Sequence, residues 1–102
     1  MHSEFTREDY EHAARAAGLT IRWLSGKAWL HTESGVIPWA PPDDDGDTFR
    51  LMLAAKIRDL TLAIGDYVAA HTYTPGDDIR ATSRKAVFFA AICKGKSMKG
   101  TP

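Results

Sequence analysis

The sequence predicts a single α+β domain in which helices cover an antiparallel sheet. The chain of 102 residues has the length of one domain. Three windows repeat apolar residues at helical spacing behind capping residues, and two windows alternate apolar and polar residues on either side of turn residues. We therefore expect the order α-β-β-α-β-β-α, with the domain at residues 1–95 and a flexible basic tail at residues 96–102.

The first helix is expected to begin after Thr6 and to end before Gly18. Thr6 is a candidate N-cap, and Asp9 lies at the N3 position, where its carboxylate can complete an imperfect capping box. Phe5 and Tyr10 flank this start with the spacing of a hydrophobic staple. Gly18 can adopt the left-handed conformation with which many helices end.

A β-meander is expected to follow this helix. Residues 21–24 and 28–32 are predicted strands, and residues 25–27, Ser-Gly-Lys, suit a tight hairpin turn between them. Residues 36–37 can extend the meander by one more strand. Pro38 would end it, because proline has no N–H to donate to a neighbouring strand.

A second helix is expected after the stiff Pro41-Pro42 entry. Asp45 or Asp47 would cap it, since an aspartate side chain can accept from the free N–H groups of the first turn. Its core-facing stripe, in which one lysine lays its methylenes along the core, is predicted to consist of Phe49, Met52, Leu53, Lys56 and Ile57.

The second half of the chain is expected to hold another hairpin and a last helix. Residues 60–64 alternate like a strand, Gly65-Asp66 suits a turn, residues 67–73 would return, and residues 74–76 break the strand. The last helix would begin at a cap, Asp77 or Asp78, and end at Gly95. Its buried face is predicted to consist of Ile79, Ser83, Ala86, Val87, Ala90 and Cys93.

Charge and composition argue against several classes of protein. The net charge is zero, so no bulk attraction to nucleic acid or to an anionic membrane is expected. Residues 1–47 hold nine acidic and four basic side chains, a net −5, and residues 48–102 hold four acidic and nine basic ones, a net +5. This asymmetry either directs a contact with a partner or cancels within the fold.

The expected location is the cytosol, without a membrane association. The single cysteine allows no intramolecular disulfide, which suits a reducing compartment. No apolar run approaches the roughly 20 residues of a membrane span. The N-terminal residues are polar and acidic, unlike a secretory signal.

Three segments resemble, in the same order, segments of a family of small phage and prophage proteins. The central one is Trp39-Ala-Pro-Pro-Asp-Asp-Asp-Gly-Asp-Thr-Phe-Arg-Leu51, which is similar to the family's Trp-Asn-Pro-Leu-x-Asp-Asp-Gly-Asp-Ala segment. The flanking ones are residues 13–19 and 80–86. The chain departs from the family where Ala-Pro-Pro stands for Asn-Pro-Leu and where Ser83 stands for an arginine. The group also resembles the phage α-β-α sandwich domain.

This resemblance implies a phage or prophage origin and action in the cytosol of an infected bacterium. It implies no reaction. The leading hypothesis is therefore a small non-catalytic binding protein that modulates or inhibits a host complex, such as a bacterial defence system.

No cofactor, metal or catalytic residue is predicted. The acidic loop, residues 43–47, resembles a calcium-binding loop, but an EF-hand needs a glutamate six residues past its glycine, and that position is Met52. The four histidines lack the spacing of a zinc site, and the serines lack a nucleophile signature. Cys93 is expected to be a buried small hydrophobe. An enzyme with a site built from the acidic loop is a further hypothesis.

Two surface patches are predicted to bind a partner. The first joins an exposed aromatic ring of the last helix, from Phe88 or Phe89, to neighbouring basic residues. The second is the acidic loop beside Trp39, whose carboxylates can compete for a nucleic-acid groove on a host complex. The full set of predicted partner-binding residues is Trp39, Asp43, Asp44, Asp45, Arg80, Arg84, Lys85, Phe88 and Phe89.

Nucleic-acid binding by a phage accessory protein is the alternative function. Basic residues along the last helix can follow a phosphate backbone, and such binding falls steeply with salt. The residues predicted to carry it are Arg80, Arg84, Lys85, Lys94 and Lys96.

Overall fold

A computed structural model describes residues 5–70 and 78–98 of the chain. Within these residues, four helices and a three-stranded antiparallel sheet confirm the α+β class, in the order α-β-β-β-α-α-α. The elements are α1 (Arg7–Ala17), β1 (Ile21–Leu24), β2 (Lys27–Thr32), β3 (Gly35–Pro38), α2 (Asp45–Ala54), α3 (Leu60–Ala70) and α4 (Ile79–Met98).

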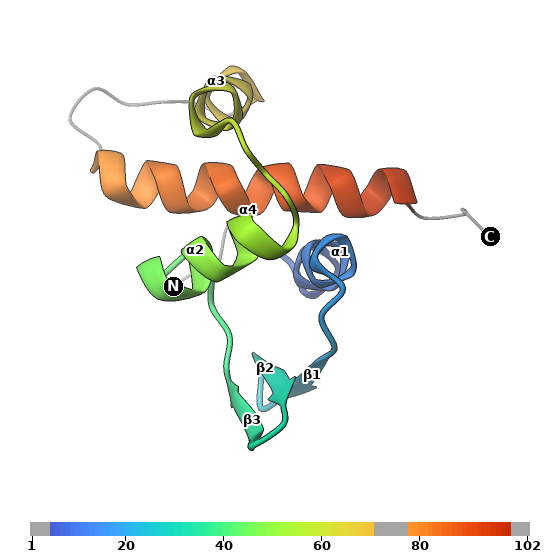
Figure 1. Ribbon diagram of the computed structural model, residues 1–102. Coiled ribbons are helices and arrows are strands. Elements are labelled where there is room, and N and C mark those ends of the chain that lie inside the picture. Colours follow the sequence, from blue (N-terminus) through green and yellow to red (C-terminus); the bar gives the residue numbers. More distant parts are fainter. Residues whose placement is uncertain (1–4, 71–77, 99–102) are drawn as a thin grey trace.

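Helix α4 is the centre of the molecule and contacts each of the other three helices. Figure 1 shows α3 on one side of α4, with α1 and α2 on the other side and the sheet beyond them. The sheet meets the helices chiefly where β1 contacts α1, and β3 is exposed along its whole length. The core is therefore a group of helices built on α4, with the sheet at its edge.

The sheet is the predicted meander, with the strand order β1-β2-β3. Leu30 of β2 lies opposite Ile21 of β1 and opposite Ile37 of β3. Ser25 and Gly26 form the first turn with φ angles of 52° and 76°. Two positive φ angles in a two-residue turn match the right-handed twist of the strands that it joins. The turn residues thus set this register. The sequence predicted the turn at residues 25–27, and Lys27 is instead the first residue of β2.

Helix α1 begins and ends as predicted. The Thr6 hydroxyl accepts from the N–H of Asp9 at 3.2 Å, and the Asp9 carboxylate accepts from the N–H of Thr6 at 3.0 Å. These two bonds complete the capping box. Gly18 follows the last turn in the left-handed conformation, with φ at 69°.

The ring of Phe88, on α4, is the centre of an aromatic cluster and is fully buried. Its centroid lies 4.8 Å from the rings of both Phe5 and Tyr10 and 6.3 Å from the ring of Trp39, each in an edge-to-face arrangement. This arrangement is favourable because the positive edge of one ring meets the negative face of another. The cluster joins the start of the chain, α1 and the β3–α2 connector to α4.

The second predicted hairpin is wrong, because residues 60–70 form helix α3. The Asp59 carboxylate accepts from the N–H of Leu62 at 2.9 Å, as an N-cap does. Ala63 and Tyr67, one turn apart, are buried. A short apolar run fits a strand or a helix, and packing on α4 favours the helix here. The predicted features that lie outside the described residues are the strand end at 71–73, the break at 74–76, the alternative cap Asp77 and the tail at 99–102.

The predicted cap of α2 is also wrong, because Asp44 caps the helix and not Asp45 or Asp47. The Asp44 carboxylate accepts from the N–H of Asp47 at 2.8 Å. The two predicted caps lie one and three residues after the observed cap, and sequence alone does not choose among them because all four carboxylates of this segment are suitable caps.

Helix α4 continues through Gly95, where the sequence predicted its end. Lys96–Met98, which were assigned to the tail, are its last residues. A Cβ atom at Gly95 would lie 1.8 Å from the carbonyl oxygen of His12 on α1. Gly95 therefore allows α1 and α4 to approach closely, and it does not end the helix. At the other end of α4, the Asp78 carboxylate accepts from the N–H of Arg80 at 2.9 Å, which confirms Asp78 as the cap.

Replacement of Gly95 by alanine should force α1 away from α4, because the clash is with backbone that cannot turn aside. We expect the free energy of unfolding to fall by at least about 2 kcal/mol, the scale of an overpacked core. The matched control is Gly65→Ala in α3, where no atom lies within 4 Å of the added Cβ. That variant should gain about 0.5–1 kcal/mol, because alanine favours a helix interior. Urea denaturation measures both, and an unchanged Gly95→Ala stability would contradict the close packing.

Helix α2 ends with a lysine in a conformation that favours glycine. Lys56 has a φ of 59°, its N–H donates to the Leu53 carbonyl at 3.2 Å, and the N–H of Ile57 donates to the Met52 carbonyl at 2.9 Å. These bonds form the Schellman motif, in which the left-handed position is usually glycine. The predicted role of Lys56 within the apolar stripe is therefore wrong, because the helix has already ended.

The Lys56→Gly variant should raise the free energy of unfolding by about 1 kcal/mol, because glycine avoids the left-handed penalty of a side chain. Lys56→Ala removes the same charge and keeps the Cβ atom, so it should give no such gain. Thermal denaturation of the two variants separates the backbone effect from the charge effect. An equal gain in both would assign the effect to the charge.

Candidate partner-binding surface

Two members of the apolar stripe that the sequence predicts for the core side of α2, Phe49 and Leu53, lie on the surface, whereas Ile57 packs against the core as predicted. The helix buries Thr48 and Leu51 instead. Phe49 is 56% exposed and Leu53 is 61% exposed. Because residues four apart share one face of a helix, these two side chains form an exposed apolar ridge. The opposite face of α2 turns inward because the Thr48 hydroxyl lies within hydrogen-bond distance of the Pro41 and Asp44 carbonyls.

The apolar face of α4 is rotated from its predicted position, although Ala86 and Val87 are buried as the sequence predicts. Ile79 is 61% exposed, and Cys93, which was expected to be buried, is exposed. Phe88 and Ala91 face the core in their place. The bulky ring of Phe88 sets the rotation of the helix, because it fills the centre of the aromatic cluster.

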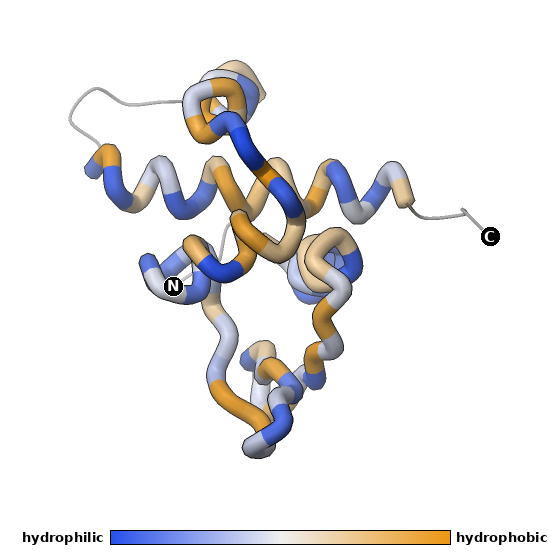
Figure 2. The backbone as a smooth tube through the Cα atoms, in the orientation of Figure 1, coloured by the Kyte–Doolittle hydropathy of each residue, from blue (hydrophilic) through white to orange (hydrophobic). Residues whose placement is uncertain are grey.

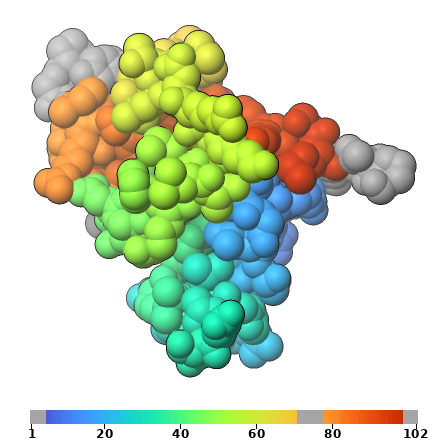
Figure 3. Space-filling model, viewed as in Figure 1, coloured from blue at the N-terminus to red at the C-terminus, as the bar shows by residue number. Residues whose placement is uncertain are grey.

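A shallow groove of about 180 Å³ lies where α2, α3 and the first half of α4 meet, and we call it the α2–α4 groove. Its apolar wall consists of Phe49, Met52, Leu60 and Val87. Its polar rim consists of Asp45, Arg80 and Arg84. Figure 3 shows the segment that leads from α2 to α3 crossing in front of α4, and Figure 2 shows that α2, α3 and α4 all carry hydrophobic residues.

The rim of this groove joins the two predicted patches into one. Arg84 donates to the Asp45 carboxylate at 2.8 Å and to the Pro42 carbonyl at 3.1 Å. Arg80 pairs with the other oxygen of Asp45 at 2.5 Å. The acidic loop and the basic helix therefore bind each other, across 39 residues of sequence in the case of Arg84. The hydrogen bond from Arg84, followed by the charge of Arg80, lowers the pKa of Asp45 below its ordinary value of 3.8.

The remaining carboxylates of the acidic loop point elsewhere. Asp44 caps α2. Asp47 is buried, accepts from the N–H of Ala40 at 3.0 Å and pairs with Arg50 at 2.7 Å. Asp43 is exposed and borders a different pocket. The four side chains thus do not converge on one point, and three of them, Asp44, Asp45 and Asp47, hold the start of α2.

The aromatic residues of the predicted patches are mostly core residues. Phe88 is fully buried and Trp39 is 3% exposed, so neither ring is available to a partner on the surface. Phe89 is partly buried and meets the ring of Tyr67 on α3 edge-to-face at 5.9 Å. Lys85 is half-buried. The exposed apolar side chains at the candidate surface are instead those that the sequence assigned to the core.

The basic residues proposed for nucleic-acid binding are largely engaged with protein oxygens. Arg80 and Arg84 face Asp45. The Lys94 ammonium donates to the carbonyl of Ala55 at the end of α2. Three of the five predicted phosphate-binding side chains therefore serve the fold. A helix C-terminus also favours the positive charge of Lys94.

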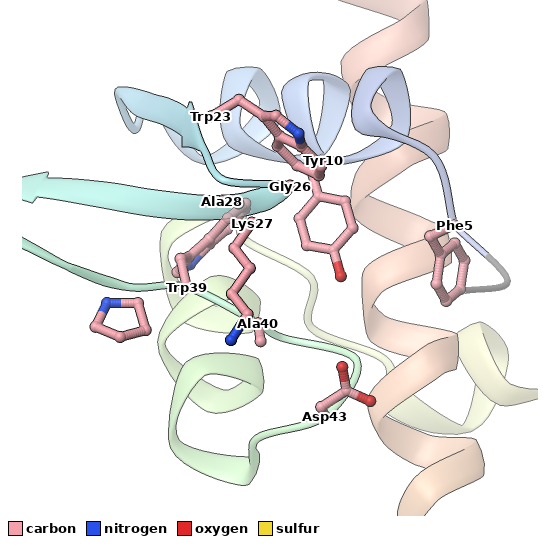
Figure 4. A pocket seen from close by; sticks show the side chains of 10 residues that line it. Phe5, Tyr10, Trp23, Gly26, Lys27, Ala28, Trp39, Ala40 and Asp43 are labelled. Atoms are coloured by element: carbon pink, nitrogen blue, oxygen red, sulfur yellow. The ribbon is translucent and has the colours of Figure 1, made fainter. Parts of the chain in front are cut away.

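An aromatic pocket of about 410 Å³ lies between the sheet and α1 (Figure 4). Tyr10, Trp23 and Trp39 line it, and Lys27 and Asp43 stand at its polar border. The centroid of Tyr10 lies 5.5 Å from that of Trp23 and 6.1 Å from that of Trp39. Tyr10 and Trp39 also belong to the aromatic cluster around Phe88, so these side chains connect the sheet to the helices.

Among the residues that the structure describes, neither a metal-ligand cluster nor a helix that could span a membrane is found. No three His, Cys, Asp or Glu side chains within residues 5–70 and 78–98 lie together as metal ligands would. The helices in these residues lack the combination of length and hydrophobicity that crossing a bilayer requires. The chain matches no family model, no curated protein and no solved structure.

The ion pairs of Asp45 with Arg80 and Arg84 should make the free energy of unfolding fall as the pH is lowered into the acid range. The pKa of Asp45 is lower in the folded chain, so its contribution is complete above 3.8 and is lost as the pH falls further, through the folded pKa. The Asp45→Asn variant should therefore be less stable than the wild type at pH 7, and this difference should close below pH 3.8. Denaturation at a series of pH values measures the gap, and a gap that is independent of pH would refute the assignment.

Proposed function

We propose that the chain is a small non-catalytic binding protein that contacts another protein through the α2–α4 groove and the apolar side chains around it. The observation that carries this proposal is the exposure of Phe49, Leu53 and Ile79, three large apolar side chains that meet no neighbour which buries them. Single exposed apolar residues are ordinary, but a connected apolar patch with a polar rim is typical of a protein interface.

The arrangement of these residues supports the proposal. Phe49 lines the groove and Leu53 lies one turn further along the same ridge of α2. Ile79 lies one turn before Ser83, which also lines the groove. Leu60 adds an apolar side chain from α3. Aromatic and arginine side chains dominate the energetics of interfaces, and Phe49 and Arg80 bring both types to this surface.

We further propose that the protein comes from a phage or prophage and modulates a host complex in the bacterial cytosol. The resemblance of residues 39–51 to phage proteins supports this part of the proposal. Inhibition of a defence system would follow if the groove occupied a surface that the host complex needs. Nucleic-acid binding is the less favoured alternative, since Arg84 and Lys94 already bond to protein oxygens.

The proposal predicts that loss of the apolar ridge abolishes partner capture. A tagged chain would be purified from infected bacterial cells, and the proteins that copurify would be quantified by mass spectrometry. The double variant Phe49→Ser/Leu53→Ser should reduce the specific partners by at least about tenfold, because it removes the centre of the contact.

The matched control is Val36→Ser/Ile37→Ser on β3, where both side chains are 41% exposed and the sheet lies away from the groove. This variant should retain the partners. Both double variants should stay within about 0.5 kcal/mol per substitution of the wild-type stability, because the side chains are exposed. Equal capture by the ridge variant and the control would sink the proposal that this surface binds a protein.

A further inference from the structure

The aromatic pocket between the sheet and α1 has the size of a small-molecule site. Its volume is about 410 Å³, and such sites span roughly 300–1,000 Å³. Three of its aromatic walls, Phe5, Tyr10 and Trp39, are 8%, 9% and 3% exposed, so the packing of the core fixes their positions. A wall that is already ordered loses little freedom when a ligand binds, which favours affinity. The pocket shares no lining residue with the α2–α4 groove and is a separate candidate site.

The walls of this pocket favour a ligand with a flat ring. The ring of Tyr10 meets those of Trp23 and Trp39 edge-to-face, with centroids 5.5 Å and 6.1 Å away. Gly26 and Ala28 line the pocket between these rings with little or no side chain. Aromatic rings attract further rings by offset stacking or by edge-to-face contact. An aromatic ligand is therefore favoured over an aliphatic one of equal size.

One lysine and one aspartate are the charged residues of the pocket. Of the lining residues that the structure describes, only Lys27 and Asp43 carry charge, and both are exposed. Neither takes part in an ion pair found among residues 5–70 and 78–98. Figure 4 shows the Trp23 indole toward one end of the pocket and both charged groups toward the other, with the Tyr10 ring between them. The pocket thus has an aromatic end and an end with one positive and one negative charge.

The nearest charged side chains outside the pocket do not change this balance. The Arg7 guanidinium lies 5.9 Å from the centroid of the Trp23 ring, but Arg7 pairs with Glu11 at 3.5 Å and does not line the pocket. A cationic ligand would meet Asp43 and also the like charge of Lys27, and an anionic ligand would meet the reverse. A ligand that carries both charges matches both side chains.

We propose that this pocket binds a free aromatic amino acid. Its ring would lie against the rings of Tyr10 and Trp23, its ammonium group would meet the Asp43 carboxylate, and its carboxylate would meet the Lys27 ammonium group. Hydrogen bonds between charged groups are roughly twice as strong as neutral ones. The flexible stem of Lys27 lets its charge adjust to the ligand. The proposal is independent of the proposed function, because no residue of the α2–α4 groove takes part.

The test is calorimetric titration of the full chain with L-phenylalanine and L-tryptophan and with probes that lack one of their parts. Phenethylamine and tryptamine keep only the ammonium group, phenylpropionate and indolepropionate keep only the carboxylate, and L-alanine lacks the ring. We expect an aromatic amino acid to bind at least about fivefold more tightly than each of its probes, since each probe leaves one feature of the pocket unmatched. A singly charged probe that binds as tightly, or no binding of either amino acid at millimolar concentration, would overturn the proposal.

Two charge variants test the position of each head group. Asp43→Asn should weaken the amino acid and the amine probe by about fivefold and spare the carboxylate probe, and Lys27→Gln should weaken the amino acid and the carboxylate probe and spare the amine. The matched control is Glu33→Gln, which removes an exposed charge beyond the far end of β2, roughly 20 Å along the strand from Lys27. It should leave every affinity within about twofold. Equal effects of the first two variants on both singly charged probes would contradict the assignment.

The ridge variant Phe49→Ser/Leu53→Ser separates this site from the proposed function. It should bind the amino acid as the wild type does, because neither residue lines the aromatic pocket. Loss of amino-acid binding in this variant, with the circular dichroism of the folded chain retained, would contradict the placement of the ligand in the aromatic pocket. Conversely, amino-acid binding that persists while partner capture fails would keep this inference and reject the proposed function.

Discussion

The packing of Phe88 among three other aromatic rings is the contact on which the rest of the fold depends. Phe5, Tyr10 and Trp39 come from three separate segments, and each meets the same buried ring on α4. A domain of this length has a small core, so a few large side chains carry a large share of its burial. The rotation of α4 that places Phe88 inward also turns Ile79 and Cys93 outward. The packing of the core therefore determines which side chains of α4 are exposed on the surface.

Sequence reasoning succeeded where the signal was local. The capping box of Thr6, the left-handed Gly18 and the hairpin turn at Ser25 all depend on a few neighbouring residues, and all are present. It failed where a contact between residues far apart in the sequence determines the local structure. Residues 60–70 fit a strand by alternation and became a helix on α4. Gly95 looked like a helix stop, and only the backbone of α1 reveals why a side chain is absent there.

At the candidate surface too, the sequence predicts local features and misses contacts between distant residues. The sequence identified the acidic loop and Arg84, but it placed them on two separate patches because pairing across 39 residues cannot be read from spacing. It also assigned Phe49 and Leu53 to the core, since helical periodicity reports an apolar face without saying which neighbour covers it. Of the four ion pairs among residues 5–70 and 78–98, three join the acidic first half of the chain to the basic second half. Ion pairs within the fold therefore neutralise part of the charge difference between the two halves of the sequence.

Helix α2 is fastened to α4 at both of its ends. Near its start Asp45 bonds to Arg84, and at its end the Ala55 carbonyl accepts from Lys94. Helix α3 follows the Ala55 anchor in the chain and precedes the Arg84 anchor. It packs mainly on α4. Substitutions on the exposed face of α3 would therefore leave α2 in place, because neither anchor involves α3. Related chains could alter one wall of the groove, and so exchange one partner for another, without rebuilding the aromatic core.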